Sequence, residues 1–426
     1  MMKRSTLTGA EHHSSPVNLE IDSTAAIHAN TPAPSSSPSF TWPAFWDRWY
    51  GALKAVFPTY LAVHLAFVVL SCLSFIFMTQ DFSPKQPRVF MLWQIWHRWD
   101  TGHYLYIATH SYTEAWRTAF FPLYPLLERG LMFFTHDNPL IAGLLISDVA
   151  CLVMLMVLYQ LVCEDFDHEH ALRTVLYISI FPTAFFFAAA YTEALFLCFV
   201  LLSFYHMRHG QWWLAGCFGF CASLTRSAGV FLLLPFCYEY LCYCQFNVKN
   251  MRFSVLSALL IPGAVGVFSF YCYERFGDWL AFSHAEAHWG RQITSPWWAI
   301  QNSIQAVRSS NLLSYQSLHN LLDLGPTLFI LALIILSLVG PWRFSRTHWS
   351  YTMYAVVVYL FIQMVPVNWA TYPLMSFGRY MLMIFPAFIM LAKLGRYRIL
   401  HQGYLCVAGS TLACLLLLYL IGRLVV

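Results

Sequence analysis

A short polar stretch between apolar segments carries residue types suited to acid–base chemistry. Residues 96–112 read WHRWDTGHYLYIATHSY and hold Arg98, Asp100 and His103, in a chain whose residues are only 10% charged. A carboxylate set between aromatic rings, with a guanidinium and imidazoles beside it, can take a proton from a hydroxyl group. The alternative is an aspartate that caps an interfacial helix beginning at Thr101. The spacing leaves both open, and we expect Asp100 to be the catalytic base.

Three further charged residues lie at the ends of predicted membrane spans. Glu193 follows the run FPTAFFFAAAYT, where an ionisable side chain close to hydrocarbon is a functional candidate by default. Arg226 lies in SLTRSAGV and Arg379 in SFGRYMLMIFP, and guanidinium forks suit the oxygens of a phosphate. The alternatives are a water-exposed glutamate at a hairpin tip and arginines that snorkel to the membrane surface. We expect all three residues to contact substrate.

Metal binding has weaker support. The loop HAEAHWGRQ places His284 and His288 four residues apart, so a helix could present both imidazoles, but a third ligand is not evident. Several of the twelve cysteines fall inside apolar segments, and none forms a CxxC pattern, so we interpret them as small apolar residues. We expect no cofactor and no metal ligands, with a divalent metal ion left open.

The composition predicts a polytopic membrane protein with an all-α fold. Of the 426 residues 59% are apolar, and the charged fraction of 10% is well below the quarter that is usual in soluble domains. We expect about eleven spans, because roughly 20 apolar residues cross a bilayer as a helix. The apolar segments are residues 57–78, 139–163, 171–190, 192–207, 211–226, 229–245, 252–273, 321–340, 349–367, 376–393 and 403–424.

The ends and loops of the chain predict its organisation and orientation. Residues 1–45 are rich in Ser, Thr, Pro and Ala and lack the apolar core of a signal peptide, so we expect a disordered cytoplasmic tail before a membrane domain of residues 46–426. Lys and Arg then gather in short loops on the cytoplasmic side. The positive-inside rule places Asp100 and the polar loop 276–318 on the opposite face. The net charge of +4 is too small to indicate nucleic acid as a partner.

These motifs resemble those of the PIG-V family of GPI mannosyltransferases and its prokaryotic relatives. RWDTGHYLYIATHSY followed by AFFPLYPLL is similar to the first block of that family. FPTAFFFAAAYTEALF, LTRSAGV and SFGRYMLMIFPAF resemble later blocks, in the same order, over about residues 92–395. The chain departs from the pattern at one point: Ser111 and Tyr112 stand where the family has GY, so we expect the turn there to differ slightly.

The resemblance implies a membrane glycosyltransferase of the GT-C type, with a large first extracytoplasmic loop, an essential aspartate and a polyprenyl-phosphate-linked mannose as donor. Asp100 matches the aspartate position. The residues to which we assign substrate binding on chemical grounds are Arg98, His103, Tyr104, Glu193, Arg226 and Arg379. We expect an inverting hexosyltransferase that acts among membrane lipids on a lipid-linked or surface glycan, in a bacterial plasma membrane rather than the endoplasmic reticulum.

A transporter or flippase for lipid-linked sugars is the alternative class. Transporters place ionisable groups near the middle of the bilayer and often contain inverted repeats. This chain has no clear internal repeat, and its charged candidates lie at the ends of predicted spans. A non-catalytic scaffold subunit is a third possibility. The motifs favour the enzyme.

Overall fold

The computed structural model describes residues 42–79, 91–368 and 371–423. Contacts divide the chain into a unit Met1–Arg48, of which only the beginning of a helix is described, and a unit Trp49–Val426. The tail predicted for residues 1–45 lies, up to residue 41, outside the described residues. Both the tail and the domain boundary therefore stay predictions.

The described residues form an all-α fold, as the composition predicts. One isolated antiparallel bridge, between Arg291 and Val367, lies outside the helices. The α-helices are α1 (Trp42–Thr79), α2 (Met91–Gln94), α3 (Asp100–His110), α4 (Leu123–Met132), α5 (Pro139–Asp165), α6 (His168–Ser179), α7 (Glu193–Arg208), α8 (Trp212–Thr225), α9 (Leu233–Tyr243), α10 (Leu260–Phe276), α11 (Ala281–His288), α12 (Trp298–Ser309), α13 (Tyr315–Leu338), α14 (Trp349–Met364), α15 (Phe377–Tyr380), α16 (Phe385–Leu394) and α17 (Arg398–Leu420). Short 3-10 segments join them, among them η2 (Ala115–Ala119), η4 (Ser227–Leu232) and η8 (Met381–Met383).

Several of these helices suit a membrane, and the chain is a multi-pass membrane protein. In the described part of the chain five helical stretches are long and apolar enough to cross a bilayer: Trp46–Ile76, Pro139–Asp165, Phe253–Phe276, Tyr315–Leu338 and Arg398–Leu420. A bent pair, Phe377–Met383 with Phe385–Leu394, raises the number to as many as six. Each of the eleven predicted segments contains a helix, but several helices are shorter than a span. The predicted number of about eleven is therefore not confirmed.

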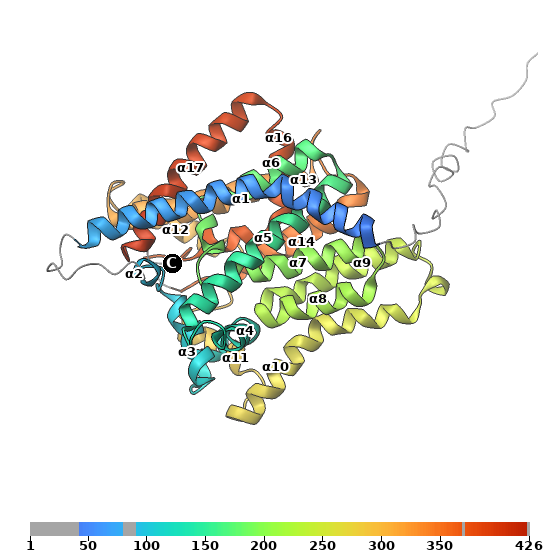
Figure 1. Ribbon diagram of the computed structural model, residues 1–426, viewed down its shortest axis with the longest axis horizontal. Helices are drawn as coiled ribbons and strands as arrows, with labels where there is room; N and C mark the ends of the chain where they lie inside the picture. The colour runs from blue at the N-terminus through green and yellow to red at the C-terminus, as the bar shows by residue number, and fades with distance from the viewer. Residues whose placement is uncertain (1–41, 80–90, 369–370, 424–426) are drawn as a thin grey trace, which may run out of the picture. The chain divides into compact units, whose positions relative to one another are not determined.

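Burial separates a central set of helices from an outer set. Most residues of α7 and α16 are buried and none is exposed, whereas the long helices expose large apolar side chains such as Val149, Val267 and Val407. Figure 1 shows α7 and α8 side by side, and α5 also packs against α7. A helix that is apolar all round is either buried in protein or surrounded by lipid. The central helices are buried in protein, and the long outer helices expose apolar side chains suited to lipid.

Local sequence sets the ends of the helices that carry polar residues. Asn138 caps α5, its side-chain oxygen accepting the amide of Ile141 at 3.2 Å, and Pro139 occupies the first turn. Pro386 lies in the first turn of α16 and cannot continue a helix from the preceding residues, and the chain bends there by 81°. As a result, Arg379 stands on a short turn before the bend rather than inside a long helix.

A buried ionic cluster ties four helices together at one end of α7. Arg208, the last residue of α7, donates to Asp165 of α5 at 2.7 Å and lies 3.5 Å from Glu239 of α9. The hydroxyl of Tyr351 in α14 donates to the same Asp165. Because α7 has 16 residues, it is about 24 Å long. The cluster therefore lies far from Glu193, at the opposite end of the same helix.

Replacing Arg208 by Met is expected to destabilise the fold by about 1–3 kcal/mol, because two carboxylates lose their charged hydrogen-bond donor. The guanidinium is 24% exposed, so solvent screens part of the loss. Unfolding of the purified protein in detergent measures the change. Arg173→Met is the matched control: Arg173 is 25% exposed and pairs with an 80% exposed Glu169, so its loss should stay below about 0.5 kcal/mol. Equal losses of stability in the two variants would contradict the stabilising role of the ionic cluster around Arg208.

Candidate active site

Four of the residues singled out in the sequence form one ionic network. Arg379 Nη1 donates to Asp100 Oδ2 at 2.7 Å, and Arg379 Nε lies 3.2 Å from Glu193 Oε1. Arg226 Nη1 donates to the same Glu193 oxygen at 2.7 Å. The Asp100 side chain is 21% exposed, whereas Arg379 and Glu193 are only 3% and 1% exposed. Asp100 is therefore the carboxylate of this network that a substrate can approach.

Helix ends bring these charges together. Asp100 is the first residue of α3 and Glu193 the first residue of α7, and the peptide dipoles at a helix N-terminus stabilise negative charge. Arg226 follows the last residue of α8, and Arg379 stands on α15. The four side chains thus meet where helices begin or end, so the network does not interrupt the long apolar spans.

Backbone strain accompanies both acidic and basic members of the network. Trp99, directly before Asp100, has a φ of 49°, and Ser376, three residues before Arg379, has a φ of 72°. Residues other than glycine adopt positive φ only where surrounding contacts hold them there, and such strain gathers at functional sites. The two turns that present Asp100 and Arg379 are therefore held in place by tertiary contacts.

Hydrogen bonds from three distant elements fix the turn before Asp100. The Tyr191 hydroxyl donates to the Arg98 carbonyl at 3.2 Å, and the Tyr419 hydroxyl donates to the Trp96 carbonyl at 3.3 Å. The Trp96 indole in turn donates to Ser71 of α1 at 3.2 Å. These contacts supply the support that the positive φ of the next residue requires.

The polar loop 276–318 adds an arginine to the network. Arg291 Nη2 donates to the Tyr380 hydroxyl at 2.7 Å, and Arg379 Nη2 donates to the same oxygen at 3.1 Å. Three guanidinium groups surround the Tyr380 ring, at 5.1 Å for Arg226, 5.3 Å for Arg291 and 4.9 Å for Arg379. Arg291 belongs to the loop HAEAHWGRQ, whose sequence indicates only weak metal binding. A basic residue in a loop on the face of Asp100 was the signal that could have found it.

A partly buried aspartate inside a candidate span supports the turn of Arg379. Asp323 Oδ1 accepts the amide of Gly378 at 3.1 Å, and Asp323 Oδ2 lies 3.6 Å from His319 Nδ1. The Gly378 carbonyl accepts the hydroxyl of Thr183 at 2.9 Å. Sequence reasoning missed Asp323, although a carboxylate within the predicted segment 321–340 is a functional candidate by the rule applied to Glu193.

The structure places the other three predicted residues beside the network rather than in it. The Tyr104 hydroxyl lies 3.4 Å from the hydroxyl of Thr192, the residue before Glu193. Arg98 donates through Nε and Nη2 to the Leu420 carbonyl at 3.1 and 2.6 Å, so it anchors the end of α17.

His103, on α3, belongs to an aromatic cluster with residues from two other parts of the chain. Its ring stacks on Phe120 at 4.9 Å and meets the edge of Trp289 at 5.1 Å. Burial lowers the pKa of His103, with Asp100 opposing and Arg117 adding to the effect, so the imidazole is neutral at pH 7. Substrate binding by Arg98, His103 and Tyr104 stays a prediction.

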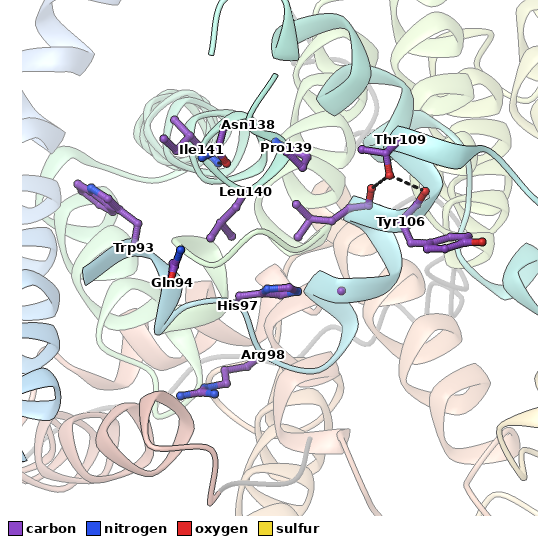
Figure 2. Close-up of a pocket in the computed structure, with 12 residues that line it drawn as sticks. Trp93, Gln94, His97, Arg98, Tyr106, Thr109, Asn138, Pro139, Leu140 and Ile141 are labelled. Atoms are coloured by element: carbon purple, nitrogen blue, oxygen red, sulfur yellow. Dashed lines mark hydrogen bonds between the residues drawn. The ribbon is translucent and has the colours of Figure 1, made fainter. Parts of the chain in front are cut away.

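A cavity of about 740 Å³ lies on the other face of α3. Gly102, Tyr106 and Thr109 line it, and these positions lie on the side of the helix opposite Asp100. The remaining walls come from Leu105, from residues 138–141, and from Trp93, Gln94, His97 and Arg98 (Figure 2). The cavity and the ionic network are therefore separated by the width of one helix.

The two histidines of the polar loop are engaged elsewhere. His284 Nδ1 lies 2.7 Å from Asp278 Oδ2, and the His288 ring stacks on Trp116 at 4.9 Å. Among the residues that the structure describes, no group of three or more His, Cys, Asp or Glu side chains is arranged to hold a metal ion. The absence of a cofactor stays a prediction.

Comparison with known proteins finds relatives for part of the chain. Over 203 residues it is 30% identical to GPI alpha-1,6-mannosyltransferase 2 of Mus musculus and 29% identical to the protein of that name from Rattus norvegicus. Each match covers 42% of this chain and 40% of the relative. The chain thus spans about two fifths of the length of these curated relatives. No family model matches the chain.

Among solved structures, the fold is similar to ArnT from Cupriavidus metallidurans bound to undecaprenyl phosphate, with a TM-score of 0.47 and 12% identity over 78% of this chain and 74% of that chain. The GPI mannosyltransferase 2 proteins belong to the family that the motifs around Asp100 and Glu193 predict. The resemblance predicted from those motifs is confirmed: the chain is similar in sequence to the GPI mannosyltransferase 2 proteins.

Proposed function

We propose that the chain is a membrane glycosyltransferase of the GT-C type, which transfers a mannosyl group from a polyprenyl-phosphate donor to a hydroxyl of a lipid-linked or surface glycan. The observation that carries this proposal is the partly exposed Asp100 carboxylate, held by the buried Arg379 in one network with Glu193 and Arg226. Similarity to GPI mannosyltransferases supports mannose as the sugar.

In the proposed reaction Asp100 takes the proton of the acceptor hydroxyl. The acceptor oxygen then attacks the anomeric carbon, and the bond from that carbon to the lipid phosphate breaks, with its electrons leaving on the phosphate. Such a single displacement needs one base and inverts the anomeric centre. By analogy with glycoside hydrolases, retention would need a second carboxylate free to act as nucleophile. Glu193 does not fit that role, because it is 1% exposed and two arginines share one of its oxygens.

The three arginines around Tyr380 differ in exposure, and this difference indicates different roles. Arg226 and Arg291 are 17% and 15% exposed and face Tyr380 together, so they can meet a phosphate that enters the site. Arg379 is 3% exposed and already holds Asp100. We therefore assign Arg226 and Arg291 to the leaving phosphate and Arg379 to the orientation of the base. Fixed guanidinium groups at the leaving group stabilise the negative charge that grows there in the transition state.

Transport of a lipid-linked sugar is less well supported. Asp100, Glu193 and Arg226 lie at helix ends, whereas transporters place such groups near the middle of the bilayer. Asp323 is the exception, being inside a candidate span, and its carboxylate is bound to the Gly378 amide. A structural role next to Arg379 explains Asp323 without a transport pathway.

Transfer in detergent separates the two functions. Purified full-length protein is mixed with polyprenyl-phosphate mannose and a mannosyl-lipid acceptor, and the anomeric configuration of the product is read by NMR. Transfer with inversion is expected. Movement of the donor across sealed vesicles without any transfer in detergent would support the transporter instead. Repeating the assay with a chelator tests whether a divalent metal ion takes part.

The proposed setting is a bacterial plasma membrane rather than the endoplasmic reticulum, with Asp100 on the non-cytoplasmic side. Arg208 in the last turn of α7 and Lys393 in the last turn of α16 lie at the other end of the central helices, which agrees with the positive-inside rule. Labelling of a single introduced cysteine at the exposed residue Asp278 from outside intact cells tests this orientation.

Asp323 is expected to act through Arg379 as a positioning residue. In Asp323→Leu the Gly378 amide loses its acceptor and the turn can shift, and a displacement of about 1 Å at a catalytic group lowers a rate by on the order of 10²-fold. Asp323→Asn keeps an oxygen in the same place and should restore most of kcat. Turnover and unfolding are measured for both variants. The positioning role is wrong if the two variants are equally inactive or both match the unaltered protein.

A further inference from the structure

The cavity on the side of α3 opposite Asp100 has the dimensions of a ligand site. Its volume is about 740 Å³, and ligand pockets usually measure about 300–1,000 Å³. Its walls are one face of α3, the start of α5 with its cap Asn138, and four residues before α3, namely Trp93, Gln94, His97 and Arg98 (Figure 2). Because Pro139 is the first residue of a candidate span, the cavity lies at one end of that span.

Neutral hydrogen-bonding groups dominate the polar part of the wall. They are contributed by Gln94, His97, Tyr106, Thr109 and Asn138. Burial, with a smaller effect from the neighbouring Arg98 charge, lowers the pKa of His97, so its imidazole is neutral at pH 7 and can both donate and accept. None of the twelve lining residues is a carboxylate.

The one charged lining residue is not directed at the cavity. Arg98 donates through two nitrogens to the Leu420 carbonyl, and Figure 2 shows its side chain turned away from the lining residues of α5. A phosphate would thus find no guanidinium aimed at it here, in contrast to the three guanidinium groups around Tyr380. The wall also carries Trp93, whose side chain is 51% exposed. An uncharged ligand rich in hydroxyl groups fits this combination.

We infer that the cavity binds a non-reacting sugar of the acceptor glycan, an inference that rests on the proposed glycosyl transfer. Amides, hydroxyls and an imidazole match sugar hydroxyls, and the indole of Trp93 provides a flat apolar surface for a sugar ring. Donor and acceptor then approach Asp100 from opposite faces of α3. Gly102 lines the cavity in the first turn of α3, and a Cβ at this position would come within 3.3 Å of His97 Nε2. The acceptor would extend from the cavity to Asp100 around the first turn of α3.

Two acceptors of different length test the inference. Trp93→Ala is assayed with octyl mannoside and with octyl mannobioside, using polyprenyl-phosphate mannose as donor. The KM for the disaccharide should rise about tenfold, as expected when an aromatic side chain that the bound ligand would cover is lost. Its kcat and the KM for the monosaccharide should not change, because the lost contact is far from the reacting bond.

Trp297→Ala is the matched control. Trp297 is 52% exposed and does not line the cavity, so its replacement should change neither KM. A similar rise in the control would show general anchoring by interfacial aromatic residues and would overturn the site. An equal rise for both acceptors in Trp93→Ala would overturn it as well.

Direct binding separates this inference from the proposed function. Calorimetric titration of octyl mannobioside into the unaltered protein and into Trp93→Ala requires no turnover. Weaker binding by the variant supports the sugar site even if no transfer occurs with any acceptor, in which case only the transferase assignment fails. Transfer by the unaltered protein with equal binding by both would remove the site and leave the transferase standing.

Discussion

Replacing Asp100 by Asn is expected to lower glycosyl transfer by on the order of 10²–10⁴-fold, because a positioned general base contributes about this much. Asparagine keeps the shape of the side chain, and its carbonyl oxygen can still accept a hydrogen bond from Arg379. It cannot take a proton from the acceptor hydroxyl. We expect kcat to carry the loss, with little change in the KM for the donor, whose phosphate is assigned to Arg226 and Arg291.

Asp278→Asn is the control for this substitution. Asp278 is 40% exposed in the polar loop on the same face and pairs with His284, so the change of charge is the same and no base is lost. Transfer by this variant should stay within about twofold of the unaltered protein, since surface substitutions away from special features have small effects. Undiminished transfer by Asp100→Asn would remove Asp100 from the reaction and with it the mechanism.

Replacing Arg379 by Met is expected to reduce both stability and turnover. Loss of one partner from a buried ion pair costs about 3–5 kcal/mol, because the remaining charge is left uncompensated. Here Glu193, at 1% exposure, keeps only Arg226, and Asp100 loses the guanidinium that orients it. We expect kcat to fall by on the order of 10²–10³-fold, as when a fixed catalytic hydrogen bond is removed.

A second substitution separates the two effects. Adding Glu193→Gln to Arg379→Met removes the uncompensated buried charge, so part of the lost stability should return. Turnover should not return, because Asp100 is still not held. Unfolding in detergent and single-turnover transfer measure the two quantities for the four members of the cycle. Strictly additive stability losses would contradict the coupling of Glu193 and Arg379 through their 3.2 Å contact.

The chemistry of the candidate site is recognisable in the sequence, because scarce charges stand out in an apolar chain. Glu193, Arg226 and Arg379 lie at the ends of apolar segments, and Asp100 lies in a short polar stretch between two of them. Asp323 is also a rare charge in an apolar segment, but the sequence analysis does not identify it, because the segment 321–340 is interpreted there only as a membrane span. The other omission has a different cause. Arg291 lies in a loop whose sequence says nothing about where the loop folds.

The extent of the helices is only partly readable from the amino acids. Apolar segments show where helices occur, because a helix buried in lipid and a helix buried in protein are both apolar. For the same reason, the composition of a segment does not distinguish a membrane span from a buried helix. Thus α7 and α16 have the composition of spans and are 16 and 10 residues long. Their place inside the bundle, surrounded by other helices, explains how they stay stable at that length.

Residue types and their order along the chain decide which helices form, where they end and which chemical groups border the membrane, because those properties depend on neighbours a few residues away. The pairing of Arg379 with Asp100 joins positions 279 residues apart, and no local pattern specifies it. Packing of α3, α7, α8 and the bent segment before α16 selects that pair, and the same packing decides that Arg98 turns to α17 while Arg291 joins the site. Charges near a membrane are stable only where a partner meets them, and only the folded arrangement of the helices supplies the partner.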